Sequence, residues 1–116
     1  MNEAKYWSGS HTKHLLLYHF TFIPKYRKRI LRYRVVKRIR ELFKECCQIN
    51  KWKIHGLEIL EEHIHLLIQL RQTDAPSKAM HYLKGGSSKV LREEFPELKE
   101  FLWGDSFWAD GYFVET

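Results

Sequence analysis

The sequence predicts an α+β fold of the ferredoxin-like type, in which an antiparallel sheet carries two helices on one face. The main observation is the order of hydrophobic patterns, which is strand, helix, strand, strand, helix, strand, the split βαβ arrangement. The second is the length of 116 residues, without internal repeat or low-complexity linker, which suffices for a single packed core. We therefore expect residues 1–116 to form one domain whose sheet leaves its other face open to a ligand.

The first half of the chain carries three predicted elements. Residues 14–23 (HLLLYHFTFI) are rich in aromatic and apolar residues, which is typical of a strand, and Pro24 ends it. Apolar residues then recur at three- and four-residue spacing over residues 33–50, which predicts a helix. Its expected inner face carries Val36, Ile39, Phe43 and Cys46, with Leu42 and Ile49 beside them. Residues 52–60 predict a second strand.

A turn and a third strand follow. Glu61 and Glu62 predict a tight turn or a strand end, and residues 63–70 are almost continuously apolar apart from two histidines, as expected of a buried strand. At the end of the chain, residues 101–116 place aromatic residues around two glycines. This segment predicts one or two short strands.

The second helix is expected to begin after Thr73 or Asp74 as its N-cap, with Pro76 in its first turn. Its inner face is expected to carry Met80, Leu83, Ser87, Val90 and Leu91. Gly85 and Gly86 lie inside this helix, where each costs about 1 kcal/mol relative to alanine. Close packing or the approach of a ligand is the expected compensation.

Charge and cysteine content narrow the classes of function. The net charge is +6, and ten of the twenty Lys and Arg residues lie in residues 25–44, opposed only by Glu41. A polyanion, most commonly nucleic acid, is the expected partner of such a patch, and a solvated helix face is the alternative. The chain has no apolar run near the roughly 20 residues that span a bilayer and no signal-peptide pattern, so no membrane partner is expected. The adjacent Cys46 and Cys47 fit a reducing cytoplasm.

The most informative motif is His63-Ile64-His65. Side chains two apart on a strand point to the same face, so both imidazoles are expected to leave the sheet side by side while Ile64 faces the other way. Two neutral imidazoles placed in this way can share one divalent metal ion. For an isolated His-x-His motif, exposed or hydrogen-bonded histidines are the commoner alternative. A structural zinc site is disfavoured because Cys46 and Cys47 lack the C-x-x-C spacing.

Four segments of the chain resemble the single-tyrosine HUH transposases of small insertion sequences, the IS200-like transposase family. They are YHFTFIPKYRKRIL (18–31), EEHIHLLIQL (61–70), LKGGSSKVLREEFP (83–96) and FWADGYFVET (107–116), in matching order and element type. The resemblance implies that His63 and His65 bind Mg²⁺ or Mn²⁺, which polarises a phosphate of single-stranded DNA. It further implies attack by a tyrosine hydroxyl to give a 5′-phosphotyrosine without ATP. The expected partners are DNA with hairpin ends and, in a homodimer, a second copy of the chain.

The chain also departs from the family pattern. The family's nucleophilic tyrosine lies on a helix after the strand that GYFVET matches, so we expect it beyond Thr116 and expect residues 1–116 not to cleave DNA. Tyr112 is expected to be structural. Glu61-Glu62 stands where the family has Pro-Asp, and Glu62 is expected either to orient His63 or to be a turn carboxylate.

Two clusters are candidates for DNA contact. The basic connection after the first strand is expected to bind phosphates through Lys25, Tyr26, Arg27, Lys28 and Arg29. A second cluster lies beside the glycine pair and consists of Lys84, Ser87, Ser88 and Lys89. The alternative for this cluster is an ordinary polar helix face. Three aromatic residues near the end can stack on bases or pack in a core, namely Trp103, Phe107 and Trp108.

Other functions share this predicted topology. RNA-recognition motifs stack bases on aromatic residues of the central strands, but this chain has His63 and His65 there, which favours metal chemistry. A catalytically inactive nucleic-acid-binding remnant or regulator and a domesticated relative that acts on repeated palindromic elements both remain open.

Overall fold

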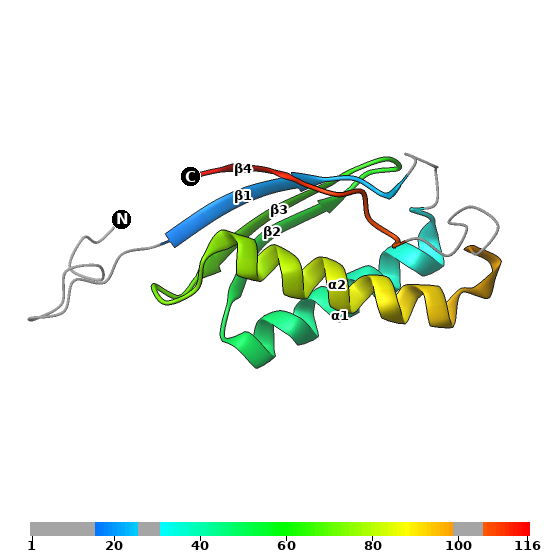
Figure 1. Ribbon diagram of the computed structural model, residues 1–116, viewed down its shortest axis with the longest axis horizontal. Helices are drawn as coiled ribbons and strands as arrows, with labels where there is room; N and C mark the ends of the chain where they lie inside the picture. The colour runs from blue at the N-terminus through cyan, green and yellow to red at the C-terminus, as the bar shows by residue number, and fades with distance from the viewer. Residues whose placement is uncertain (1–15, 26–30, 99–105) are drawn as a thin grey trace, which may run out of the picture.

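The computed structural model describes residues 16–25, 31–98 and 106–116, and within them both predicted helices cover the same face of one sheet (Figure 1). The elements, in chain order, are strand β1 (Leu16–Phe22), helix α1 (Tyr33–Asn50), strands β2 (Lys53–Ile59) and β3 (Ile64–Leu70), helix α2 (Pro76–Glu94), the short 3₁₀ helix η3 (Pro96–Leu98) and strand β4 (Phe113–Glu115). The strands are arranged in the order β2-β3-β1-β4, and all neighbours are antiparallel. The predicted α+β fold is confirmed. No described helix is both long and apolar enough to cross a membrane.

The register of the central strands determines which side chains are neighbours on the open face. His65 of β3 pairs with Thr21 of β1 on one side and with Glu58 of β2 on the other. The β2–β3 register shifts between Ile54 and Gly56, where β2 has an irregularity of the bulge type. At the other edge, Thr21 pairs with Phe113 of β4.

The hydrophobic core lies between the sheet and the two helices. The strands contribute five side chains that are at most 2% exposed, Phe20, Phe22, Ile64, Leu66 and Ile68. Each such side chain stabilises the fold by roughly 1.5–3 kcal/mol relative to an exposed one. Phe107 and Trp108 also lie in this core, whereas Trp103 is outside the described residues. Packing, and not base stacking, is therefore the role of these two aromatic residues.

The buried face of α1 agrees with the prediction at Ile39 and Phe43, but at its two ends Val35 and Cys47 are buried in place of Val36 and Cys46. Its fully buried residues are Val35, Ile39, Phe43 and Cys47, which follow each other at a four-residue spacing along the helix. Val36 and Cys46 are only half-buried against the core, and Ile49 is 80% exposed. The prediction for Ile49 is wrong because the sheet contacts the middle of the apolar stripe, and Ile49 lies outside this contact.

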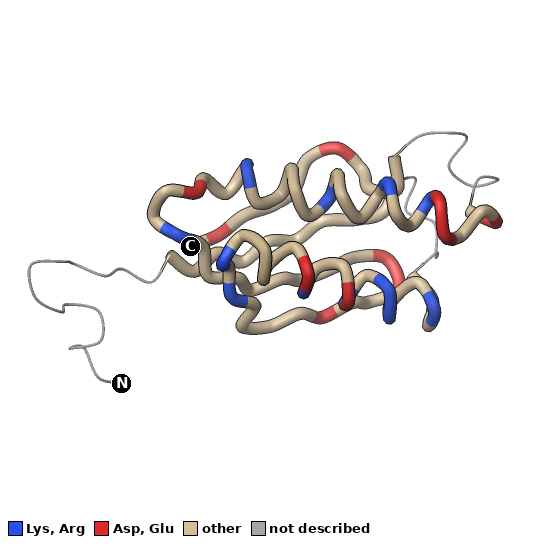
Figure 2. Tube along the Cα trace, turned by 90° about the horizontal axis from the view of Figure 1, so that it is seen from below, with Lys and Arg blue, Asp and Glu red and all other residues tan. Residues whose placement is uncertain are grey.

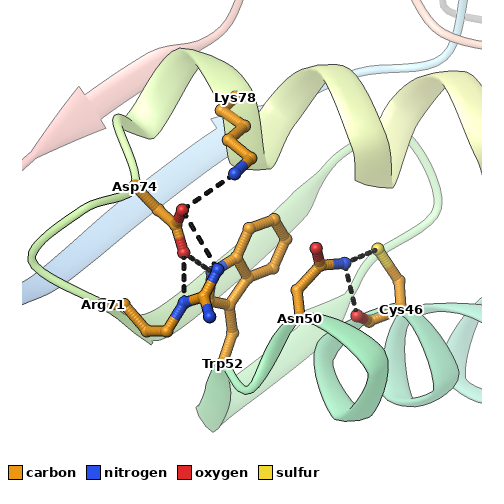
Figure 3. A network of polar contacts seen from close by, with 6 residues as sticks. All are labelled: Cys46, Asn50, Trp52, Arg71, Asp74 and Lys78. Atoms are coloured by element: carbon orange, nitrogen blue, oxygen red, sulfur yellow. Dashed lines mark hydrogen bonds and ion pairs between the residues drawn. The ribbon is translucent and has the colours of Figure 1, made fainter.

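The start of α2 also differs from the prediction. Its N-cap is Ala75, no side chain caps the helix, and Pro76 occupies the first turn, where a missing N–H costs nothing. Asp74 is buried and accepts hydrogen bonds from Trp52 Nε1 (2.7 Å), Arg71 Nε (2.8 Å) and Lys78 Nζ (2.9 Å), as Figure 3 shows. Asp74 therefore joins the start of β2 to α2 instead of capping the helix.

The two glycines of α2 are not explained by close packing. A Cβ atom built on Gly85 or on Gly86 would meet no heavy atom within 4 Å. The expectation that tight packing compensates for their helix cost is wrong within this chain, and the approach of a ligand stays a prediction.

Candidate metal-binding and nucleic-acid site

His63 and His65 lie together on the sheet face opposite to the one on which Ile64 is buried under the helices. His63 comes directly before β3, at the end of the turn in which the Leu60 N–H donates to the His63 carbonyl (2.9 Å). The two ring centroids are 4.9 Å apart at an interplanar angle of 85°, while Ile64 is fully buried on the helix side. The predicted placement of the two rings is confirmed, and their binding of a metal stays a prediction.

His65 is held by two side chains of β1. Its Nδ1 atom lies 3.2 Å from the Thr21 hydroxyl, and its ring is stacked on that of His19, with centroids 5.1 Å apart and an interplanar angle of 11°. When Nδ1 carries the proton and donates to Thr21, Nε2 keeps its lone pair for a metal ion. Sequence reasoning missed Thr21 and His19. Their two-residue spacing on a strand was visible, but the register that brings them beside His65 was not.

His65 and His19 border a shallow hollow of about 460 Å³ on the open face. Its lining includes His19, Gly56, Glu58, His65 and Leu67, so one carboxylate and two imidazoles face the same space. Among the described residues, no group of three or more His, Cys, Asp or Glu side chains is arranged to hold a metal ion. The His63–His65 pair therefore suits an ion whose other ligands are water or substrate oxygens.

Glu62 lies in the turn between β2 and β3, next to His63 in the sequence, and is half-buried. A carboxylate adjacent to a metal-binding histidine can hold the ring in one orientation. Its expected role in orienting His63 stays a prediction.

The predicted basic connection begins at the same end of the sheet as the histidines. Lys25 follows β1, whose last residue, Phe22, pairs with Ile64, and the Lys25 backbone N–H donates to the Phe107 carbonyl (2.8 Å). Lys25 is thus placed near the end of β3 from which His63 projects. The other four predicted contacts, Tyr26, Arg27, Lys28 and Arg29, lie outside the described residues.

The basic residues of α1 are partly neutralised. Arg38 forms a bidentate pair with Glu94 of α2 (2.7 and 3.0 Å), and Arg34 lies 3.9 Å from Glu97. The pairing with Glu94 and Glu41 raises the pKa of Arg38 further above its ordinary value. Figure 2 shows Lys and Arg interspersed with Asp and Glu along the helix-covered side. Within α1, the basic residues therefore do not form one continuous positive surface.

The second predicted DNA cluster is wrong for its two serines. Ser87 and Ser88 are 3% and 5% exposed, and both hydroxyls have partners inside the protein. The Ser87 hydroxyl accepts from Trp108 Nε1 (2.8 Å) and donates to the Leu83 carbonyl, while that of Ser88 accepts from the Phe107 N–H (2.8 Å). Helical spacing already predicted Ser87 on the inner face, where a buried hydroxyl needs an internal partner.

The two lysines of this cluster differ from each other. Lys84 is half-buried, and its ammonium group donates to the carbonyls of Ala109 and Gly111, both at 2.7 Å. Burial lowers the pKa of Lys84. Lys84 therefore holds the segment before β4 against α2. Lys89 is exposed on α2, and its contact with DNA stays a prediction.

The chain is similar to a protein family as a whole and to individual transposases. Residues 12–116 match the family model described as "Transposase IS200 like". The transposase for insertion sequence element IS200 of Salmonella typhimurium is 33% identical over 109 residues, which are 94% of this chain and 72% of that protein. The ISDra2 transposase TnpA of Deinococcus radiodurans is 29% identical over 101 residues, covering 87% of this chain and 72% of that protein.

Two solved structures share the fold. A Deinococcus radiodurans protein solved as a candidate transposase superimposes with a TM-score of 0.84 at 27% identity, covering 94% of this chain and 84% of that one. A REP-associated tyrosine transposase bound to a REP hairpin gives a TM-score of 0.61 at 13% identity, covering 92% of this chain and 61% of that one. The second likeness shows the fold alone.

Proposed function

This chain belongs to the IS200-like transposase family, and from this we propose that it binds single-stranded DNA with hairpin ends and supplies the metal-binding part of a strand-transfer site. The observation that carries the proposal is the His63–His65 pair on the helix-free sheet face, at the end where Lys25 lies. Family members act as transposases, so the substrate proposed here is the end of a mobile element.

His63 and His65 would hold Mg²⁺ or Mn²⁺, with the choice of ion resting on the likeness to the family. When bound, the ion would polarise the scissile phosphate as a Lewis acid. The chain itself keeps the two imidazoles together on a rigid strand, and Thr21 and His19 restrict the ring of His65. Glu58, in the same hollow, adds negative charge that attracts a divalent cation.

The nucleophile of this proposal is a tyrosine other than the four described ones. Tyr18 and Tyr112 pack on Phe20, Tyr82 packs near Trp52, and Tyr33 lies exposed on α1. None of these four lines the histidine hollow. We place the nucleophile on a segment that follows Thr116, as the likeness to the family implies. Its oxygen would form a bond to phosphorus while the bond from phosphorus to the 3′ oxygen breaks, and the released 3′ oxygen takes a proton.

A metal titration tests the histidine assignment. The double variant His63→Ala/His65→Ala is expected to lose Mn²⁺ binding measured by calorimetry, while its affinity for a hairpin oligonucleotide changes by less than about threefold. His81→Ala is the matched control, because His81 is exposed on α2 away from the hollow. Unchanged Mn²⁺ binding in the double variant would show that the ion is held elsewhere.

A cleavage assay tests the placement of the nucleophile. Residues 1–116 are expected to bind a single-stranded hairpin oligonucleotide but to leave it uncut in the presence of Mn²⁺. Electrophoresis of radiolabelled DNA after protease treatment detects both the cut and a covalent adduct. Efficient formation of a phosphotyrosyl adduct by these residues would contradict the proposal.

A further inference from the structure

A positively charged groove lies between α1 and the edge strand β2. It has a volume of about 500 Å³, and its lining includes three cationic residues, Arg40 and Lys44 of α1 and Lys53 of β2. His55 also lines it, and no carboxylate does so among the described residues. The groove therefore differs from the rest of the helix-covered side, where charges of both signs are mixed (Figure 2).

The two flanks of α1 explain this difference. On the flank that faces α2, Arg38 is paired with Glu94 and Arg34 lies near Glu97. On the flank that faces β2, Arg40 donates one hydrogen bond to the Leu57 carbonyl (3.3 Å), which places its guanidinium at the sheet edge. A guanidinium has five N–H donors, so this single contact leaves capacity for an anion. The positive charge of this flank is not balanced by acidic groups in the groove.

The groove and the histidine hollow share two lining residues at the edge strand. These residues are Gly56 and Leu57, which follow the irregularity of β2 and pair with Leu67 and Leu66 of β3, respectively. At Gly56 the edge strand carries no side chain that would separate the two spaces. A flexible chain can therefore pass from the open face of the sheet over this point into the groove.

We propose that single-stranded DNA follows this path. A strand whose phosphate reaches His63 and His65 would continue over Gly56 into the groove, where Arg40, Lys44 and Lys53 bind its phosphates. The path turns around the edge of a sheet, which single-stranded DNA can do. A duplex, with a persistence length of about 150 base pairs, cannot do so without a large cost. This inference rests on the proposed function, because it takes the histidine hollow as the point from which the strand departs.

The test compares two charge variants of residues 1–116. Lys44→Gln/Lys53→Gln removes two exposed cations of the groove, and Arg34→Gln/Lys37→Gln removes two exposed cations of α1 outside it. Affinity for a hairpin with a single-stranded extension and for the hairpin alone is measured by fluorescence anisotropy at several salt concentrations without divalent metal. Melting curves establish that both variants are folded.

The groove variant is expected to bind the extended oligonucleotide roughly tenfold more weakly. The slope of log affinity against log salt should fall by about 1.4, because each phosphate contact with a single strand contributes about 0.7. The control variant should change neither the affinity nor the salt slope. The hairpin alone should bind equally well to the wild type and to both variants. Equal losses in both variants, or an equal loss on the hairpin alone, would overturn the path proposed here.

A variant that changes no charge tests the proposed path independently. Gly56→Val adds a side chain between the groove and the hollow, and a Cβ atom there meets only Leu67 Cβ at 3.7 Å, an ordinary contact. It is expected to weaken binding of the extended strand but not of the hairpin, and unchanged binding of both would overturn the passage at Gly56. Failure of the wild-type chain to bind either DNA would instead refute the proposed function.

Discussion

Thr21 illustrates how one hydroxyl can determine what a histidine does. Its Oγ1 atom lies 3.2 Å from His65 Nδ1 and comes from a strand 44 positions earlier in the sequence. When this hydroxyl accepts from Nδ1–H, it stabilises the form of His65 that leaves Nε2 free as a metal ligand. In the proposed site, Thr21 is thus a positioning residue that acts through His65.

Replacement of Thr21 tests this role. Thr21→Val keeps the shape of the side chain but removes the acceptor, so Mn²⁺ affinity measured by calorimetry should fall by roughly 10- to 100-fold. Thr21→Ser should restore most of it, and hairpin affinity should not change in either variant. Equal Mn²⁺ affinity of the valine and serine variants would show that the hydroxyl does not orient His65.

The ionisation of Asp74 should affect the stability of the fold. The pKa of its carboxyl group is held well below the usual range by hydrogen bonds from Arg71, Trp52 and Lys78. The folded state therefore binds the proton less readily than the unfolded state, whose Asp pKa is about 3.9. The stabilisation is fully present above that pH and is lost as the pH falls below it.

The Asp74→Asn variant is expected to melt at a lower temperature than the wild type at pH 7. The difference should shrink as the pH is lowered from 5 to 2, because protonation removes the charge from the wild type as well. Circular dichroism melting curves over this range measure both effects. A difference in melting temperature that stays constant from pH 5 to pH 2 would contradict the role of the charged carboxylate.

At the scale of elements, α2 uses its polar residues to hold the end of the chain. Ser87 and Ser88 bind Trp108 and Phe107, and Lys84 binds two carbonyls just before β4. These contacts place β4 beside β1, because the segment that leads to β4 is fixed to the helix. Three of the residues predicted to contact DNA, Lys84, Ser87 and Ser88, are therefore part of what completes the sheet.

The glycine pair of α2 gives a prediction about helix stability. Gly85→Ala and Gly86→Ala should each raise the free energy of unfolding by up to about 1 kcal/mol, because alanine favours the helix and nothing opposes the added Cβ atom. Urea denaturation measures the change. A loss of stability in either variant would mean that these positions need glycine for the fold itself.

At the scale of the whole molecule, the sheet edges among the described residues are the strands β2 and β4, each with one described partner strand. The β2 edge carries charged and polar side chains, whereas β4 exposes Phe113 (78%) and Val114 (42%). An exposed apolar edge strand favours pairing with another chain. The homodimer that the family likeness implies is therefore expected to form through β4.

Sedimentation velocity tests this association. Residues 1–116 are expected to form dimers at micromolar concentration, and Phe113→Glu is expected to shift them toward monomers without lowering the melting temperature of the monomer. Phe113 is exposed, so its replacement leaves the core intact. A wild-type chain that stays monomeric, or a variant that dimerises equally well, would refute pairing through β4.

The sequence by itself determined the order and type of the elements, the bounds of α1 and the placement of His63 and His65 on one face, because these depend on local periodicity. Tertiary structure alone decided which residues meet across the fold. Thr21 reaches His65, Asp74 binds Trp52, and Ser87 and Ser88 turn inward to the segment before β4. The register of two strands and the rotation of a helix depend on how complete layers pack, and spacing along one segment does not contain this information. The same packing separated the basic residues of α1 into a flank partly neutralised by Glu94 of α2 and Glu97 of η3 and a flank that faces the groove at β2.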